Sequence, residues 1–179
     1  FMTRCYETAF WYSGPIEEFG SPRNDLLFHP PTALRAQICK KLGVDPVKKL
    51  VLYAPTFRAD GSLEPYSLDI PRVLDAFDRR FGGSHCMLLR LHPNLDAKSD
   101  ALSCDNLTTF NVTRYPDMQE LLAVADVVIT DYSSLMFDFA LTGRPCFQFA
   151  TDIAAYRQDR SFNFSLDALP FPLAENNDQ

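Results

Sequence analysis

Two residues near the middle of the sequence have the right types and spacing to handle a phosphate group. Arg90 and His92 are separated by one residue, so in an extended chain both side chains point to the same side. A guanidinium and an imidazole held side by side can bind a diphosphate, and the imidazole can protonate a departing phosphate. The simpler alternative is that His92 bonds a backbone carbonyl and has only a structural role.

A second candidate site lies in residues 126–139, which read DVVITDYSSLMFDF. An apolar, strand-like run leads to Ser133 and Ser134, and serine is favoured at the start of a helix. Free backbone N–H groups and the positive end of the helix dipole at such a start suit a phosphate. Asp138 follows within a helix that is apolar almost all round, so we expect this helix to be buried and the carboxylate to need a partner. The alternative is a purely structural role, in which a serine only caps the helix and the Asp138 side chain is exposed to solvent.

Thr56 and Arg58 form a third group, because they closely follow an apolar run at residues 50–54 and could reach a ligand at its end. Taken alone, Arg58 is as readily interpreted as a solvated charge in a loop. The other histidines, His29 and His85, have no such neighbours, and we expect both in surface loops. The sequence contains no G-x-x-x-x-G-K-[ST], G-x-G-x-x-G or G-x-S-x-G motif, so the common nucleotide-binding and hydrolase classes lose support.

Strands and helices that alternate along the chain must position these groups. We predict strands at residues 50–54, 86–91, 126–130 and 146–149, with a weaker one near 107–110. We predict helices at residues 32–42, 69–81 and 116–125, and a fourth that begins within 131–134 and ends at 141. This alternation is typical of an α/β fold, a Rossmann-like parallel sheet with helices on both faces. Ligands bind beyond the carboxyl ends of such strands, so the three groups should converge there. The first 28 residues and residues 150–179 show no regular pattern.

Composition favours one globular domain and excludes several classes of protein. The 179 residues are 46% hydrophobic and include 15 Phe, which rules out a disordered chain. The net charge of −6 repels a phosphate backbone, so no nucleic acid is expected as a partner. The five cysteines lack C-x-x-C spacing and are odd in number, which fits a reducing compartment better than zinc or disulfides. No apolar run is long enough to span a bilayer, and no signal peptide is recognisable.

Four segments together resemble the CDP-glycerol glycerophosphotransferase family, the teichoic acid primases and polymerases. They are GSPRND at residues 20–25, VLYAPTFR at 51–58, LRLHP at 89–93 and the DVVITDYSSLMFDF run at 126–139. Similar pieces follow at residues 143–145, 152–156 and 160–162, so the resemblance covers nearly the whole chain. Ser161 departs from the pattern, since many members have Gly there.

The resemblance implies a GT-B transferase of two Rossmann-like domains, of which this chain is the C-terminal, donor-binding half. Residues 1–28 would then be an inter-domain linker and residues 29–179 the nucleotide-binding domain. The family's other half carries a histidine-glycine motif that is thought to supply a base, and this chain has no His-Gly pair. We therefore expect the chain alone to bind nucleotide without transferring anything. No metal or other cofactor is implied, and the resemblance indicates a cytoplasmic enzyme that contacts the membrane only through other parts of a longer protein.

By position, the resemblance assigns His92 to the donor pyrophosphate, where it would assist the departure of CMP. The reaction would be attack of a hydroxyl of a polyol-phosphate or glycan acceptor on the β-phosphate of CDP-glycerol or a related cytidine nucleotide. Two alternatives remain open: a GT-B glycosyltransferase with another CDP-, CMP- or UDP-linked donor, and a non-catalytic nucleotide-binding module. The implied donor-binding residues are Thr56, Arg58, Arg90, Ser133, Ser134 and Asp138.

Overall fold

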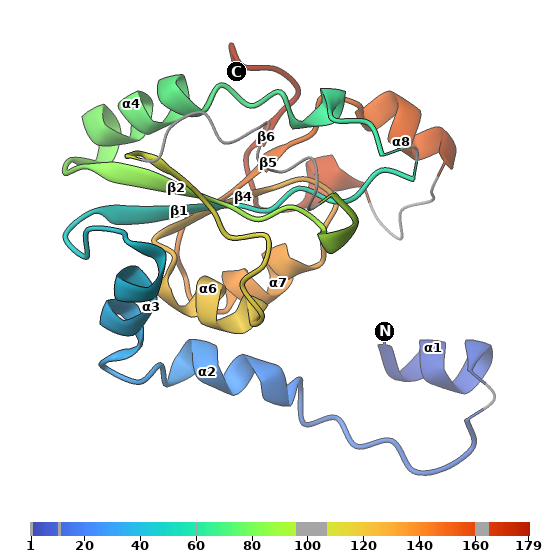
Figure 1. Ribbon diagram of the computed structural model, residues 1–179. Coiled ribbons are helices and arrows are strands. Elements are labelled where there is room, and N and C mark those ends of the chain that lie inside the picture. Colours follow the sequence, from blue (N-terminus) through green and yellow to red (C-terminus); the bar gives the residue numbers. More distant parts are fainter. Residues whose placement is uncertain (1, 11, 60, 96–106, 160–164) are drawn as a thin grey trace.

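Six parallel strands form a single sheet in the part of the chain that the computed structural model describes, residues 2–10, 12–59, 61–95, 107–159 and 165–179 (Figure 1). Their order is β3-β2-β1-β4-β5-β6 and every neighbouring pair is parallel. This is the strand order of a Rossmann-type sheet, so the predicted α/β fold is confirmed. The strands are β1 Lys49–Tyr53, β2 His85–Leu89, β3 Thr109–Asn111, β4 Val127–Thr130, β5 Cys146–Phe149 and β6 Leu173–Ala174.

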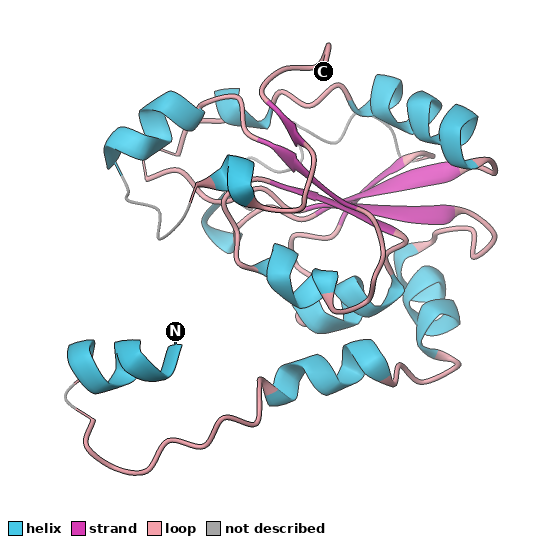
Figure 2. Cartoon of the chain, turned by 180° about the vertical axis from the view of Figure 1, so that it is seen from behind, coloured by secondary structure: helices cyan, strands magenta, loops and turns pink. Residues whose placement is uncertain are grey.

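Helices lie on both faces of the sheet (Figures 1 and 2). One face carries α4 (Ile70–Phe81) and α8 (Ile153–Asp159), and the other carries α3 (Leu34–Leu42), α6 (Met118–Val124) and α7 (Leu135–Ala140). Side chains of β1 alternate between the two cores: Leu50 and Leu52 pack on the α3 and α6 side, and Val51 and Tyr53 on the α4 side. Both faces of the strands are therefore apolar, as a covered parallel sheet requires.

Local signals start and end the helices where the sequence predicts. The Asp69 carboxylate accepts the Arg72 N–H at 3.2 Å and caps α4, whose first turn contains Pro71. The end of α3 lies at Gly43, whose φ of 70° is in the left-handed region that glycine tolerates best. Three-residue 3₁₀ helices occur at Pro22–Asn24 (η1), Glu64–Tyr66 (η2), Pro93–Leu95 (η3) and Leu166–Ala168 (η5).

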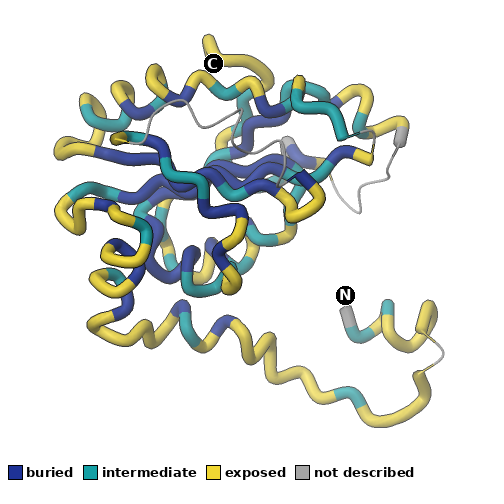
Figure 3. Tube along the Cα trace, viewed as in Figure 1, coloured by how far each residue is buried: buried dark blue, intermediate teal, exposed yellow. Residues whose placement is uncertain are grey.

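The start of the chain contains two helices that the irregular sequence pattern did not indicate. The first, α1 (Met2–Ala9), lies away from the sheet at the end of an exposed segment (Figures 1 and 3). The second, α2 (Asp25–Phe28), follows η1 and contacts α6, and its Leu27 is buried in the same core as α3. Residues 22–28 therefore pack on the sheet domain. The boundary predicted between residues 28 and 29 stays a prediction.

The expectation that residues 150–179 are irregular is wrong, because the structure places α8 and β6 there. The two residues of β6 pair with Gln148 and Phe149 of β5. The strand conformation therefore depends on pairing with β5, and the local sequence pattern does not indicate it. The cysteines Cys39, Cys86 and Cys146 are buried and free. Cys104 and the family-like piece at residues 160–162 lie outside the described residues.

His85 is not in a surface loop, which corrects the sequence interpretation. It is the first residue of β2 and its side chain is 1% exposed. The Asp78 carboxylate accepts the backbone N–H of His85 at 2.8 Å and lies 2.7 Å from the His85 Nδ1 atom. The two glycines before His85 end α4 early enough for the strand to begin there, and Asp78, on the last turns of α4, supplies a partner for Nδ1 of the buried imidazole.

Candidate functional site

An open pocket of about 540 Å³ lies beyond the carboxyl ends of β1, β2 and β4. The strand order reverses between β1 and β4, and this is where ligands bind in sheets of this topology. We call it the strand-end pocket. Its lining includes four of the predicted site residues, together with Phe57, Met118 and Leu135, which sequence reasoning missed; the four are Thr56, Arg90, His92 and Ser133.

His92 lies on the wall of this pocket with its ring against an aromatic side chain. The centroids of the His92 and Phe57 rings are 5.0 Å apart, and the planes are tilted by 36°. The backbone N–H of Asn94 donates to Nδ1 of His92 at 3.2 Å. An accepting Nδ1 leaves the proton of the neutral ring on Nε2, so the ring offers an N–H donor on its other side.

Arg90 is a partly buried cation held in place by backbone carbonyls. Its Nη1 donates to Val112 at 2.9 Å, to Thr113 at 2.7 Å and also to Tyr115. Within the described ranges, no carboxylate lies within 4 Å of this guanidinium, so its charge is not neutralised by an ion pair there. Burial lowers the pKa of Arg90 from its ordinary value, because removal from water disfavours the charged form. An anionic ligand would relieve that cost.

Arg58 has the opposite environment, since two carboxylates neutralise it. Its Nη2 lies 2.9 Å from Oδ2 of Asp131, and its Nε lies 2.6 Å from Oδ2 of Asp152. Burial opposes the charge on Arg58, but the two carboxylates outweigh it and raise the pKa of Arg58 above its ordinary value. Arg58 lines a neighbouring pocket and not the strand-end pocket. The contact with a phosphate that sequence predicts for Arg58 would have to compete with both carboxylates.

Asp131 joins the two loops that follow β1 and β4. Its Oδ1 accepts the backbone N–H of Thr56 at 2.8 Å and that of Tyr132 at 2.6 Å, and its side chain is 1% exposed. A buried carboxylate with these donors on one oxygen and Arg58 on the other is fully engaged. Asp131 therefore sets the position of Thr56 relative to the turn that leads to Ser133.

A stack of tyrosines closes the other side of this cluster. The rings of Tyr132 and Tyr156 lie 3.7 Å apart and 20° from parallel, and the Tyr132 hydroxyl donates to Asp152 at 2.8 Å. The Arg58 guanidinium lies over both rings, 4.8 Å from the Tyr132 centroid and 5.2 Å from that of Tyr156. Cation–π contacts of this kind add to the two ion pairs. The loop after β1, the loop after β4 and α8 are thereby tied together.

The two serines before α7 have different surroundings. Ser133 lines the strand-end pocket, and its Oγ accepts the Leu135 N–H at a long 3.4 Å. Ser134, the residue before the first turn of α7, is exposed and makes no side-chain cap. The prediction that α7 is buried all round is wrong: Met136 and Phe139 face the core, while the side chain of Phe137 is 40% exposed. A short helix beside two elements buries only the side that faces them.

Asp138 has partners, as the sequence requires, and they come from the start of the chain. Its Oδ2 pairs with Arg23 Nη2 at 2.9 Å, and its Oδ1 accepts a hydrogen bond from Asn24 at 2.9 Å. The third and fourth residues beyond Gly20 in the GSPRND segment, Arg23 and Asn24, thus meet the last part of the DVVITDYSSLMFDF run. Asp138 does not line the strand-end pocket. The donor-binding role that the resemblance implies for Asp138 stays a prediction.

Among the site residues that sequence reasoning missed, Asp131 and Asp152 are the most informative. Asp131 follows β4 directly, so the rule that places functional groups after strands points to it. Asp152 begins no predicted element; it opens the family-like piece at residues 152–156, and its contact with Arg58 places it in the site. No three His, Cys, Asp or Glu side chains in the described ranges lie together closely enough to hold a metal ion. No helix in that part of the chain combines the length and apolar character needed to cross a membrane.

Comparison with known proteins identifies the family. The family model of the CDP-glycerol:poly(glycerophosphate) glycerophosphotransferases matches residues 1–179. The teichoic acid poly(glycerol phosphate) polymerase of Staphylococcus epidermidis is 34% identical over 97% of this chain and 25% of its own length. The solved structure of the wall teichoic acid polymerase TagF is 33% identical and superposes with a TM-score of 0.78 over 98% of this chain and 43% of that chain. A variant of TagF soaked with CDPG, an abbreviation of CDP-glycerol, gives the same TM-score.

The match is complete for this chain and partial for its relatives. The chain spans 24% to 46% of the length of the first curated relatives that it matches. The same six-stranded α/β domain is therefore one part of those longer proteins. The resemblance carried by the four sequence segments is confirmed over the whole chain. This chain belongs to the CDP-glycerol:poly(glycerophosphate) glycerophosphotransferase family.

Proposed function

We propose that this chain is the donor-binding half of a glycerophosphotransferase and holds the diphosphate of CDP-glycerol in the strand-end pocket. An acceptor hydroxyl attacks the β-phosphate, a new P–O bond forms to the acceptor, and the bond to the bridging oxygen breaks to release CMP. His92 donates the proton that the departing phosphate needs. The acceptor is a polyol-phosphate or a glycan of the teichoic-acid type.

The uncompensated charge of Arg90 is the observation that carries this proposal. Among the described residues no carboxylate pairs with this partly buried guanidinium, and its charge is costly unless an anion completes the site. It lines one pocket with an imidazole and a serine hydroxyl, which is a suitable set of donors for a diphosphate. TagF, a relative with the same fold, has been soaked with CDP-glycerol.

The six predicted donor-binding residues divide into three groups in this proposal. Thr56, Arg90 and Ser133 line the pocket and face the diphosphate. Arg58 supports the pocket wall through Asp131, so its effect on the ligand is indirect. Ser134 and Asp138 lie outside the lining and enter only if the ligand extends toward α7.

In this proposal, catalysis also requires a second domain that is not part of this chain. The acceptor and the base that activates its hydroxyl are expected on a facing domain, because the relatives are two to four times as long. Without that base and the closed cleft, the proximity contribution of about 7–11 kcal/mol is lost, and the chain alone binds nucleotide without measurable transfer. We place the reaction in the cytoplasm at the inner membrane face, where such a nucleotide donor and a growing wall polymer meet.

Titration calorimetry of the chain with CMP, CDP-glycerol and a UDP-sugar tests the proposal. The Arg90→Gln variant should bind CDP-glycerol about tenfold or more weakly, because a charge-assisted contact is lost. Arg144 is a matched control, since it also donates to three backbone carbonyls, those of Leu122, Ala123 and Ala125. It precedes β5 and therefore lies at the amino end of the sheet, away from the pocket.

The outcomes separate binding from folding. Arg90→Gln and Arg144→Gln should both lower the melting temperature of the chain. Only Arg90→Gln should also lower its affinity for the nucleotide. Equal binding by both variants would remove Arg90 from the site. Failure of the unaltered chain to bind any cytidine nucleotide at millimolar concentration would overturn the donor assignment, and preference for the UDP-sugar would change the donor class.

A further inference from the structure

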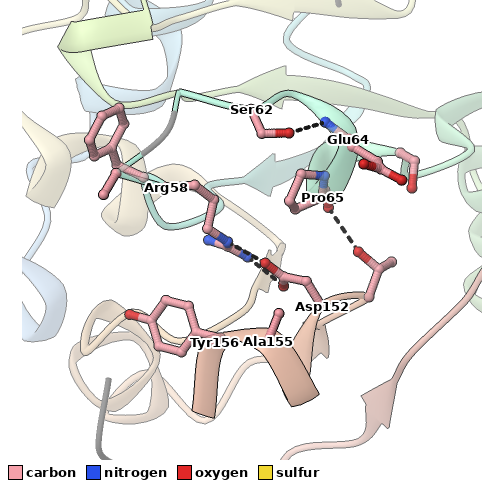
Figure 4. Close-up of a pocket in the computed structure, with 11 residues that line it drawn as sticks. Arg58, Ser62, Glu64, Pro65, Asp152, Ala155 and Tyr156 are labelled. Atoms are coloured by element: carbon pink, nitrogen blue, oxygen red, sulfur yellow. Dashed lines mark hydrogen bonds and ion pairs between the residues drawn. The ribbon is translucent and has the colours of Figure 1, made fainter. Parts of the chain in front are cut away.

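A second pocket, of about 570 Å³, lies between the loop after β1, η2 and the first turn of α8 (Figure 4). We call it the α8 pocket. In Figure 4 the side chains of Arg58 and Asp152 meet on one side of it, and Ala155 and Tyr156 of α8 form its floor. A volume of several hundred cubic ångströms is in the range of small-molecule sites. The diphosphate is proposed to bind in the strand-end pocket, so the α8 pocket has no role in binding it.

The charges around the α8 pocket exclude an anionic occupant. Among the described residues that line it, Arg58 is the cation, and Asp131 and Asp152 already neutralise it. Hydrogen bonds from Arg58 and Tyr132 outweigh the effect of burial and hold the pKa of Asp152 below its usual value, so this carboxylate is ionised. Glu64 adds another negative group at the rim. A phosphate would meet net negative charge here, whereas an uncharged group would not.

The polar groups of this lining are suited to hydroxyl groups. The Thr151 hydroxyl donates to the Pro65 carbonyl at 3.3 Å, and its oxygen keeps the ability to accept. Asp152 accepts two hydrogen bonds from Arg58 and one from Tyr132, and its own backbone N–H also stabilises the carboxylate, so Asp152 fixes the pocket wall and the Thr151 oxygen is the acceptor left for a hydroxyl. The Pro65 and Tyr156 side chains supply apolar surface for carbon–hydrogen groups. Alternating hydroxyl and C–H contacts are what a polyol presents.

Phe57 connects the α8 pocket to the strand-end pocket, because it lines both. On the strand-end side its ring packs on His92, the residue proposed to act beside the β-phosphate. A group attached to that phosphate would pass Phe57 to enter the α8 pocket. We propose that the α8 pocket is a subsite for an uncharged, hydroxylated polyol next to the transferred phosphate; the inference rests on the proposed function for the position of that phosphate.

Filling the pocket provides the test. Ala155 is an exposed residue of α8 whose side chain lines the pocket, so Ala155→Trp fills the space without disturbing the core. Ala154 is its exposed neighbour on α8 and does not line the pocket, so Ala154→Trp is the matched control. Calorimetry of both variants with CDP-glycerol and with CDP, and with a short glycerol phosphate oligomer, compares ligands with and without the polyol.

The expected result is a selective loss. Ala155→Trp should lower the affinity for CDP-glycerol by about tenfold, since the polyol loses its contacts. The affinity for CDP should stay unchanged, because CDP has no polyol. A loss of binding by the oligomer alone would also support the subsite and assign the polyol to the acceptor. Equal affinities of Ala155→Trp and Ala154→Trp for all three ligands would overturn the inference. Absence of CDP binding by the unaltered chain would instead refute the proposed function, and the oligomer would still decide the subsite.

Discussion

The Arg58 guanidinium lies 2.9 Å from the Asp131 carboxylate, and the two side chains are only 8% and 1% exposed. They come from loops 73 residues apart in the sequence. Through Asp131 the pair also holds the backbone N–H of Thr56, one of the residues that line the strand-end pocket. The most buried ion pair that the structure describes therefore supports the wall of the candidate site.

Asp131→Asn should destabilise the protein by roughly 3 kcal/mol or more, because it leaves the Arg58 charge partly uncompensated in a buried place. Urea unfolding followed by circular dichroism measures this change. Asp75→Asn is the control, since Asp75 pairs with Arg79 on the surface and its side chain is 63% exposed. That variant should unfold like the unaltered chain. Equal stability of Asp131→Asn and Asp75→Asn would show that the buried pair contributes nothing net.

Stability should fall on acidification partly through Asp152. Its pKa is lower in the folded chain than the ordinary 3.8, so the native state binds this proton less readily than the unfolded state does. The contribution of Asp152 is therefore present above that ordinary value and is lost as the pH falls through the lower, folded value. Urea unfolding at pH 7 and pH 3 should show a smaller difference for Asp152→Asn than for the unaltered chain. An unchanged difference would contradict this assignment.

Ser133→Ala should weaken binding of CDP-glycerol several-fold, while Ser134→Ala should not. Ser133 lines the strand-end pocket and Ser134 does not, although the two are adjacent. Losing a serine before a helix costs only about 1 kcal/mol, and the one hydrogen bond of this kind here is long, so both variants should stay folded. Calorimetry and melting curves check the two effects. The reverse order of affinities would move the phosphate toward the exposed start of α7.

His92→Ala should lower transfer by about 100-fold in an active protein that carries this sequence, the usual contribution of a general acid. Nucleotide affinity should change much less, because Arg90 and Ser133 remain in the pocket. A radiolabelled glycerol phosphate transfer assay measures the rate, and calorimetry measures the affinity. His29→Ala, at an exposed histidine after α2, is the control. Turnover near that of the unaltered protein would leave His92 with a structural role only, through its ring contact with Phe57 and its hydrogen bond from Asn94.

Most of the fold could be predicted from the sequence because its signals are local. Continuous apolar runs indicated the central strands, and residues such as Asp69 and Gly43 marked helix ends. Local sequence patterns did not predict the elements whose conformation depends on a strand or a side chain elsewhere in the fold. The two-residue strand β6 exists because β5 offers it an edge, and His85 is buried because Asp78 supplies a hydrogen-bond partner.

The sequence by itself determined that polar groups follow the strands and gather at one edge of the sheet, because parallel strands place their carboxyl ends together. Only the tertiary structure decided what each of them contacts there. Arg58 and Arg90 both come soon after a strand, yet distant carboxylates neutralise Arg58, while backbone carbonyls hold Arg90 and none of the described carboxylates pairs with it. Asp131 and Asp152 lie 73 and 94 residues from Arg58, a separation at which no sequence pattern specifies a contact. Whether an arginine side chain is already paired with a carboxylate depends on the residues that folding packs against it.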